Sequence, residues 1–144
     1  MSDNLYKVNS GRDIRVVVVS AYGELDLGRV TEFKDKPVYE KIESKPLSGG
    51  RIQMSAPDGW DLEISVDRHS PALDELAARM EADWFDNGIL RSSTVYAYIR
   101  ELSGEQSDFM YPGVDLRLTD AGTWKRGNPV GQTLSGYAPR KKKI

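Results

Sequence analysis

The sequence predicts a mainly β fold, an antiparallel sandwich or barrel, with a single α-helix against one side or end. Segments 60–67 and 113–119 alternate apolar and polar residues, which is the pattern of strands with one covered face. Apolar residues recur at helical spacing over about residues 71–86. The order of strands, one helix and further strands favours this architecture over alternating strand–helix units.

Composition indicates one soluble globular domain spanning residues 1–144, of which 39% are hydrophobic and 29% charged. We expect no transmembrane helix, because no apolar run approaches the length that one needs. We also expect no signal peptide, because residues 1–13 lack a basic stretch followed by an apolar one. Cysteine is absent, which excludes disulfides and thiolate metal sites and fits a reducing cytosol.

Charge is distributed unevenly along the chain. The 20 basic and 22 acidic residues include Arg140 and three lysines at 141–143, so the rest of the chain holds 16 basic against 22 acidic residues. The body is therefore acidic and the segment 139–144 is basic. We expect this short basic segment to be solvated, although it has the composition to contact nucleic acid or an acidic partner.

The first third of the chain predicts strands separated by a long excursion. Residues 13–20, DIRVVVVS, indicate a strand covered on both sides. Segment 29–50 has a poor pattern, and Pro37 and Pro46 argue against a central strand. We interpret it as an extended arm or loop between two strands, the second of which restarts at 51–54.

A turn is predicted at Pro57-Asp58-Gly59, followed by the strand WDLEISVD. Its alternation places an apolar row on one face and a polar row on the other. The apolar row is Trp60, Leu62, Ile64 and Val66, and the polar row is Asp61, Glu63, Ser65 and Asp67.

Helix signals follow this strand. Ser70 is the expected N-cap with Pro71 at the first helical position, and Asn87-Gly88 is the expected end. We expect Trp84 and Phe85 to belong to the core. Two further strands, 93–101 and 106–119, flank a short connection typical of a hairpin, and a last strand is predicted over about 129–138.

The residue types needed for catalysis are missing from the pattern. His69 is the single histidine and lies between a strand end and a helix start, where a surface or capping role is favoured over a general base. Asp61 and Glu63 share a strand face, but no calcium-loop spacing supports an ion site there. No phosphate loop is present either. We therefore predict no enzyme, no catalytic residues, no cofactor and no metal.

The order of these elements resembles tail tube proteins of contractile-tailed bacteriophages, which are related to the tubes of contractile injection systems. The similar segments are APDGWDLEISVDR, the helix SPALDELAARMEADWFDNG and the strand SSTVYAYIRE. The most specific one is DFMYPGVDLRLTDAGTWKRGNPVGQTLSGYAPRKKK. Together they cover roughly residues 50–143, and the first 50 residues are similar only in outline.

This resemblance implies a structural virion protein with a tail-tube-like fold, made in the host bacterial cytoplasm. Copies of it would form stacked hexameric rings around a lumen through which phage DNA is ejected. The implied partners are further copies of itself and the tail sheath, baseplate, tape measure and tail terminator proteins. DNA would pass without specific binding, and no membrane is involved.

An acidic body suits such a conduit, because like charge repels phosphates. The acidic row Asp61, Glu63 and Asp67 is the candidate lumen-facing set, whereas Asp115 and Arg117 make a mixed row. The excursion 29–50 suits an arm that reaches another subunit or ring. Its candidate intersubunit residues are Val38, Tyr39, Ile42 and Leu47.

The sequence also fits several alternatives. One alternative within the same class of structural proteins is the tube of a contractile injection system, or a baseplate protein that initiates the tube. In another class, it is a nucleic-acid-binding β-barrel that stacks bases on exposed Tyr96, Tyr98 and Tyr111, although the acidic body argues against this. A hydrolase on a β-sandwich is third, weakened by the missing catalytic set.

Overall fold

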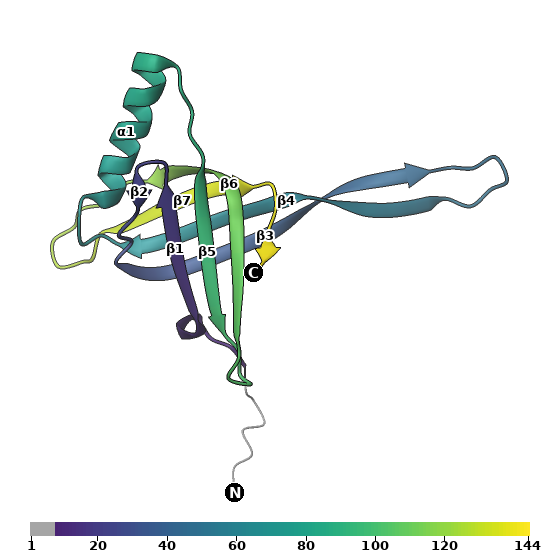
Figure 1. The fold of residues 1–144 in the computed structure, drawn as a ribbon, viewed down its shortest axis with the longest axis horizontal. Helices are drawn as coiled ribbons and strands as arrows, with labels where there is room; N and C mark the ends of the chain where they lie inside the picture. Colours follow the sequence, from purple (N-terminus) through teal and green to yellow (C-terminus); the bar gives the residue numbers. More distant parts are fainter. Residues whose placement is uncertain (1–7) are drawn as a thin grey trace, which may run out of the picture.

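The computed structural model describes residues 8–144 and is mainly antiparallel β-sheet with one α-helix, as the sequence predicts. One continuous sheet, in the order β2-β1-β5-β6-β7-β4-β3, folds over on itself so that two layers cross steeply (Figure 1). The first layer contains β1, β5 and the start of β6; the second contains the rest of β6 with β7, β4 and β3. The strands are β1 Ile14–Ser20, β2 Gly23–Glu24, β3 Arg29–Ser44, β4 Ile52–Asp67, β5 Ser93–Arg100, β6 Gln106–Asp120, β7 Gly131–Ala138 and β8 Lys142–Lys143.

Strand β6 joins the two layers. Its first half pairs with β5 as far as Val114, and its second half pairs with β7 from Asp115 onward. The register shifts between these halves, at Pro112 and Gly113, where Gly113 has a positive φ of 64°. A bulge of this kind bends a strand, so one strand can serve both layers and close a corner of the sandwich.

The core fills the space between the layers, and the alternation of the sequence predicts most of it. Leu62, Ile64 and Val66 of β4 are buried, and so are Val114 and Leu116 of β6. These residues face one another across the layers. The polar rows of the same strands remain on the outside.

The expectation that β1 is covered on both sides is wrong. Val16 and Val18 are buried, but Val17 is only half-buried and Val19 is exposed. The helix, which would have been the natural cover, does not lie over the outer face of this strand, because it packs at the end of the sandwich (Figure 1). Continuous apolar composition here therefore reflects β-propensity more than two-sided burial.

Helix α1 spans Ala72–Asn87, one residue later than predicted at each end. Pro71 occupies the N-cap position, and Gly88 ends the helix in the left-handed conformation with φ 67°. Only Leu73 and Leu76 of the first two turns are buried. The second half of the helix extends beyond the sheets (Figure 1).

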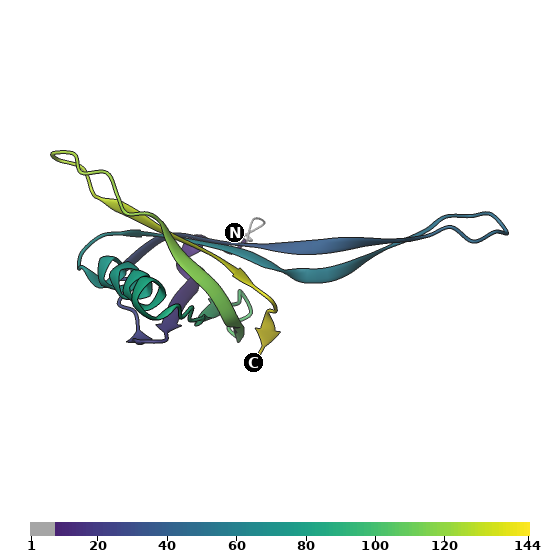
Figure 2. The same ribbon diagram turned by 90° about the horizontal axis from the view of Figure 1, so that it is seen from above.

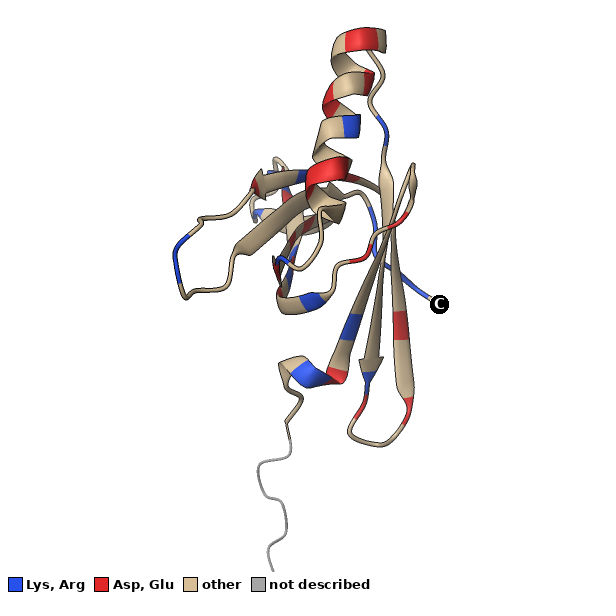
Figure 3. Cartoon of the chain, turned by 90° about the vertical axis from the view of Figure 1, so that its left-hand side faces the viewer, with Lys and Arg blue, Asp and Glu red and all other residues tan. Residues whose placement is uncertain are grey.

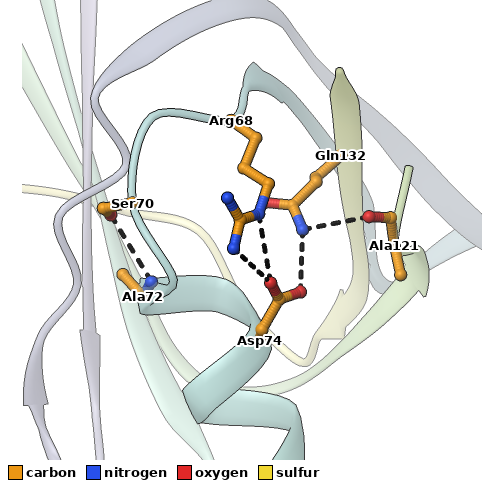
Figure 4. A network of polar contacts seen from close by, with 6 residues as sticks. All are labelled: Arg68, Ser70, Ala72, Asp74, Ala121 and Gln132. Carbon is orange, nitrogen blue, oxygen red and sulfur yellow. Dashed lines mark hydrogen bonds and ion pairs between the residues drawn. The ribbon is translucent and has the colours of Figure 1, made fainter. Parts of the chain in front are cut away.

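A polar network links the start of this helix to the ends of β4 and β7 and to the segment after β6 (Figure 4). Arg68 Nε and Nη2 donate to Asp74 Oδ2 at 3.1 and 3.0 Å, just after β4. Gln132 of β7, which is buried, donates to Asp74 Oδ1 at 2.9 Å and to the carbonyl oxygen of Ala121 at 3.1 Å. Because every buried polar atom here finds a partner, the helix has a defined direction relative to the sheet.

Strand boundaries in the second half of the chain agree with the sequence to within two residues. The turn predicted at Pro57-Asp58-Gly59 is wrong, because β4 runs through it without interruption. Asp58 is an extra residue relative to β3, since Val38 pairs with Gly59 and Tyr39 with Pro57. The turn-forming residues thus produce a bulge instead of a reversal. In the described part of the chain, no helix is long and apolar enough to cross a membrane.

Candidate assembly surfaces

Strands β3 and β4 form a hairpin that is much longer than the sheet to which it belongs. Strand β4 pairs with β7 only over Trp60–Asp67, whereas it pairs with β3 as far as Ile52. Segment 38–59 is therefore a two-stranded ribbon that projects from the body, as both views show (Figures 1 and 2). We call this ribbon, with its turn at 45–51, the arm. Strand β3 is an edge strand, as Pro37 indicated.

The arm has one apolar and one polar face. Residues paired across an antiparallel ladder share a face, and the register joins Ile42 to Met54 and Ser44 to Ile52. Lys41 and Glu43 lie on the opposite face, where Glu43 accepts from Lys41 at 2.7 Å and from Arg51 at 3.1 Å. The apolar face is uncovered, because Ile42, Ile52 and Met54 are all exposed.

The four arm residues chosen from the sequence occupy different places. Ile42 lies on the apolar face, Tyr39 on the polar face, and Leu47 in the fully exposed turn. Val38 is half-buried at the root of the arm. Sequence reasoning missed Ile52 and Met54, although the alternation in Arg51-Ile-Gln-Met was the available signal.

The C-terminal segment anchors the root of the arm. Lys141 Nζ lies 2.8 Å from Asp35 Oδ2 on β3, and the Tyr111 hydroxyl donates to the same oxygen at 2.6 Å. The ammonium group also lies 4.7 Å from the ring centre of Trp60 and 4.3 Å from that of Phe109. These are favourable cation–π distances. Because Asp35 and Trp60 adjoin the first residues of the arm, this contact holds the arm against the body.

Burial and hydrogen bonding shift the pKa values of this cluster. Burial alone would raise the pKa of Asp35, but the hydrogen bonds from Lys141 and Tyr111 outweigh it and hold that pKa below the ordinary value. Burial, the hydrogen bond to Asp35 and its negative charge raise the pKa of Tyr111 far above the usual tyrosine range. Asp35 is therefore ionised and Tyr111 neutral at ordinary pH.

The expectation that the basic segment is simply solvated is wrong for Lys141. The Lys141 side chain is only 18% exposed. Lys142 and Lys143 form β8 and pair with Met110 and Phe109 of β6. Arg140 is exposed. The segment is thus part of the fold.

The proposed lumen row lies on the outer face of the second layer. Asp61 and Glu63 are exposed and Asp67 is half-exposed. The register places a basic residue of β3 opposite each of them: Lys36 opposite Asp61, Lys34 opposite Glu63 and Arg29 opposite Asp67. The row is acidic along β4 alone, and the face it belongs to has mixed charge.

On this face the side chains surround a shallow hollow. Its volume is about 350 Å³, and its lining includes Lys34, Lys36, Asp61, Glu63 and Arg117. Asp67 lies 3.8 Å from Arg29, whose side chain is largely exposed, and an exposed ion pair of this kind adds little to stability. The charges here suit a wet, weakly interacting surface.

A third exposed surface lies at the far end of α1. Trp84, Phe85, Ile89 and Leu90 are 49%, 79%, 41% and 77% exposed. We call these four residues the helix-end patch. The expectation that Trp84 and Phe85 belong to the core is wrong, because the stripe continues past the point where the sheets end. Exposed apolar clusters of this kind mark interaction sites.

The tyrosines proposed as a base-stacking surface are not all available. Tyr111 is fully buried in the core, so it cannot stack on a base. Tyr96 and Tyr98 are half-buried on the outer face of the first layer and stack on each other with ring centres 6.2 Å apart. Arg15 lies over the Tyr98 ring at 5.0 Å.

His69 lies at the surface, as expected, with its Nε2 3.1 Å from Asp26 Oδ2. Among residues 8–144, no cluster of three or more histidine, cysteine, aspartate or glutamate side chains has the arrangement of a metal site. The prominent features of the surface are therefore the arm, the helix-end patch and the charged outer face.

Comparison with solved structures identifies the architecture. A chain from the sheath–tube complex of an extracellular contractile injection system, PVC, in its extended state is 11% identical, with 98% of this chain and 93% of that chain aligned and a TM-score of 0.61. A chain from the PVC sheath/tube terminator gives 10% identity, 96% and 97% coverage and a TM-score of 0.64. The chain has a tail-tube-like fold.

A chain from the virion of a native gene transfer agent particle has the same fold, with 10% identity, 95% and 99% coverage and a TM-score of 0.52. No protein-family model and no curated protein matches the sequence. The resemblance noticed in the sequence is thus confirmed at the level of fold. The alignments with the PVC chains span nearly all of both chains.

Proposed function

We propose that this chain is a structural subunit of a tail tube, in which copies close into six-membered rings that stack inside a contractile sheath. The observation that carries the proposal is the tail-tube-like fold over nearly the full length of the chain, combined with an arm whose apolar face is uncovered. An exposed apolar ribbon is an aggregation hazard in a free monomer. In a stack of rings, neighbouring copies cover it.

The open edges of the sheet support the same proposal. Strands β1 and β3 lie near the two ends of the strand order, with only the short β2 beyond β1. Ring closure pairs such edges between copies and removes them from solvent. The exposed outer faces then line the lumen or face the sheath. Asp61, Glu63 and Asp67 are proposed for the lumen.

The cargo of the tube separates two versions of this proposal. In a phage tail, DNA passes through the lumen on ejection, and the partners are the sheath, baseplate, tape measure and terminator proteins. The alternative is the tube, or baseplate initiator, of a contractile injection system. The matches to PVC chains support this alternative, because they cover as much of this chain as the match to the gene transfer agent does.

Negative-stain electron microscopy and sedimentation of the purified protein test the proposal. We expect rings or tubes of uniform diameter with a central channel, formed at moderate protein concentration. Monomers alone, over a wide range of concentration and in both low and high salt, would refute a tube function. A second test shortens the arm within residues 40–56 by deleting equal numbers of paired residues from both strands. This change should leave the body folded but weaken the stacking of rings.

A further inference from the structure

Two exposed apolar surfaces lie at opposite sides of the molecule and cannot meet within one chain. The turn of the arm carries Leu47, and the helix-end patch lies at the far end of α1. Figure 1 shows the arm extending to one side while the helix rises from the other side of the body, and Figure 2 shows the same separation. Any contact between these surfaces must therefore join two copies.

The helix-end patch sits in an unusually acidic environment. Helix α1 has acidic residues in its last turns and no basic residue in its final turn, although the C-terminal end of a helix favours positive charge. Figure 3 shows acidic residues along the helix. Asp83 is engaged by Arg91 at 3.0 Å and by the Tyr22 hydroxyl, whereas Glu81 and Asp86 are exposed.

The turn of the arm has the opposite charge. Lys45 and Arg51 flank Leu47, and segment 45–51 contains no acidic residue. Arg51 shares Glu43 with Lys41, and Lys45 is exposed. An apolar side chain between two cations therefore faces outward at the arm, and an apolar cluster between carboxylates faces outward at the helix. The two surfaces are complementary in both respects.

We propose that the turn of the arm of one copy docks on the helix-end patch of a second copy. Leu47 would lie against Phe85 and Leu90, with Lys45 and Arg51 near Glu81 and Asp86. This inference rests on the proposed tube function and names the surface that receives the arm. Because the two surfaces differ, the contact is head-to-tail and leaves a free arm and a free patch at the ends of any assembly, as a growing tube requires.

A single contact of this size is small, so it acts through repetition. The turn and the patch together involve few residues, and an isolated pair of copies should associate only weakly. Between two stacked rings, several such contacts form at once, and their combined effect is strong. The arm can reach beyond its own body, because about seven residues of extended strand from Val38 to Ser44 span roughly 23 Å.

The absence of cysteine allows a direct cross-linking test. Leu47→Cys protein is mixed with Phe85→Cys protein, allowed to assemble, and treated with a short bis-maleimide. We expect a heterodimer at a yield about tenfold above that of a control mixture, since the repeated contact concentrates the two thiols. The control pairs Leu47→Cys with Ser103→Cys, which lies in the exposed β5–β6 turn.

Charge reversal provides an independent measurement by sedimentation of the assembled form. Lys45→Glu with Arg51→Glu should raise the concentration needed for assembly about tenfold, since like charges then face each other. Adding Glu81→Lys and Asp86→Lys to the same chain should restore assembly. If the arm docked elsewhere, the variant with all four substitutions would not recover assembly.

The outcomes separate this inference from the tube function. Rings or tubes that form without heterodimer, or whose charge reversal is not rescued, refute the docking site and leave the tube function intact. The double variant Phe85→Ser with Leu90→Ser provides another outcome. If it forms normal tubes in the absence of sheath protein but these tubes do not bind sheath protein, the docking site is also refuted, because the helix-end patch then contacts the sheath. Monomers in every mixture refute both proposals together.

Discussion

The two halves of strand β4 follow the same alternation of apolar and polar residues, but their apolar residues differ in burial. In Trp60–Asp67 the apolar residues Leu62, Ile64 and Val66 are buried between the layers, whereas in Ile52–Gly59 the apolar residues Ile52 and Met54 are exposed. The difference lies in the neighbours: the first half pairs with β7 and faces the other layer, and the second half pairs only with β3. Alternation therefore identifies a strand and its sides, but not which chain covers the apolar side.

The boundary between the halves is built from specific contacts. Gly59 has a φ of 115°, which disfavours any residue with a side chain, and a Cβ there would overlap the Tyr137 ring. The Tyr137 hydroxyl donates to the carbonyl oxygen of Asp58 within the bulge. On the opposite face, Lys141 holds Asp35 and Trp60. The arm therefore leaves the body at a fixed place.

The largest effect should come from truncating the buried half. Ile64→Ala removes a fully buried side chain and should lower the free energy of unfolding by about 3 kcal/mol, because it leaves a cavity between the layers. Met54→Ala, in the exposed half, should change it by less than about 0.5 kcal/mol but should weaken assembly. Urea denaturation of the monomer and sedimentation of the assembled form measure the two quantities. Equal destabilisation by both changes would mean that the halves do not differ as described.

A smaller loss is expected at the boundary. Lys141→Ala removes the charged hydrogen bond to Asp35 and the contacts with Trp60 and Phe109, and should cost about 2 kcal/mol. Lys142→Ala is the matched control. The Lys142 side chain is adjacent to Lys141 in the chain but exposed, so its removal should change the free energy of unfolding by less than about 0.5 kcal/mol. Thermal unfolding followed by circular dichroism compares them. Hydrogen exchange in 38–44 should accelerate in the first variant only, since the root of the arm loosens.

The same cluster predicts a pH dependence at both extremes. The raised pKa of Tyr111 stabilises the fold below about pH 10, the ordinary tyrosine value, and this contribution is lost as pH rises further. The lowered pKa of Asp35 stabilises the fold above about pH 4, and this contribution is lost as pH falls. Denaturation midpoints measured from pH 3 to about pH 11 test both directions.

Tyr111→Phe should remove the alkaline part of this dependence, because phenylalanine has no proton to lose. Tyr39→Phe is the control, since Tyr39 is exposed on the arm, away from the Asp35 cluster, and should leave the alkaline loss unchanged. An alkaline loss that persists unchanged in Tyr111→Phe would place its origin in other groups.

Local pattern determined what could be predicted from the sequence. The strands of the second half and the helix were found because period and capping signals agree there, and Gly88 ends the helix as its position indicated. Pro57-Asp58-Gly59 was predicted as a turn but forms a bulge, because a bulge and a turn use the same residue types. The difference depends on whether β3 continues alongside, which is a non-local property.

The candidate surfaces were harder to predict because burial depends on where elements end relative to one another. Trp84 and Phe85 continue the helical stripe, but the sheets stop before them. Lys141 reads as one of four cations in a basic segment, and only the fold brings it to Asp35, 106 residues away. Composition gave the acidic character of the β4 row, but not the lysines that the register places beside it.

The smallest effect on stability should come from the charged outer face of the buried half. Asp61→Lys with Glu63→Lys changes exposed residues and should alter the free energy of unfolding by less than about 1 kcal/mol, through lost pairing and new repulsion across the strands. The functional effect should be large if this row lines the lumen. The new lysines would join Lys34 and Lys36 and bind passing phosphates.

Assembled particles provide the measurement. Tails built from this variant should eject DNA slowly or incompletely at low salt and recover as salt rises, since each phosphate contact releases counterions. Glu24→Lys with Glu105→Lys, at exposed positions away from this face, changes the net charge equally and should leave ejection normal. Unchanged ejection in both variants would mean that the Asp61 row faces the sheath. Failure of the first variant alone to assemble would place the row in a contact between subunits, because a solvated face tolerates such a change.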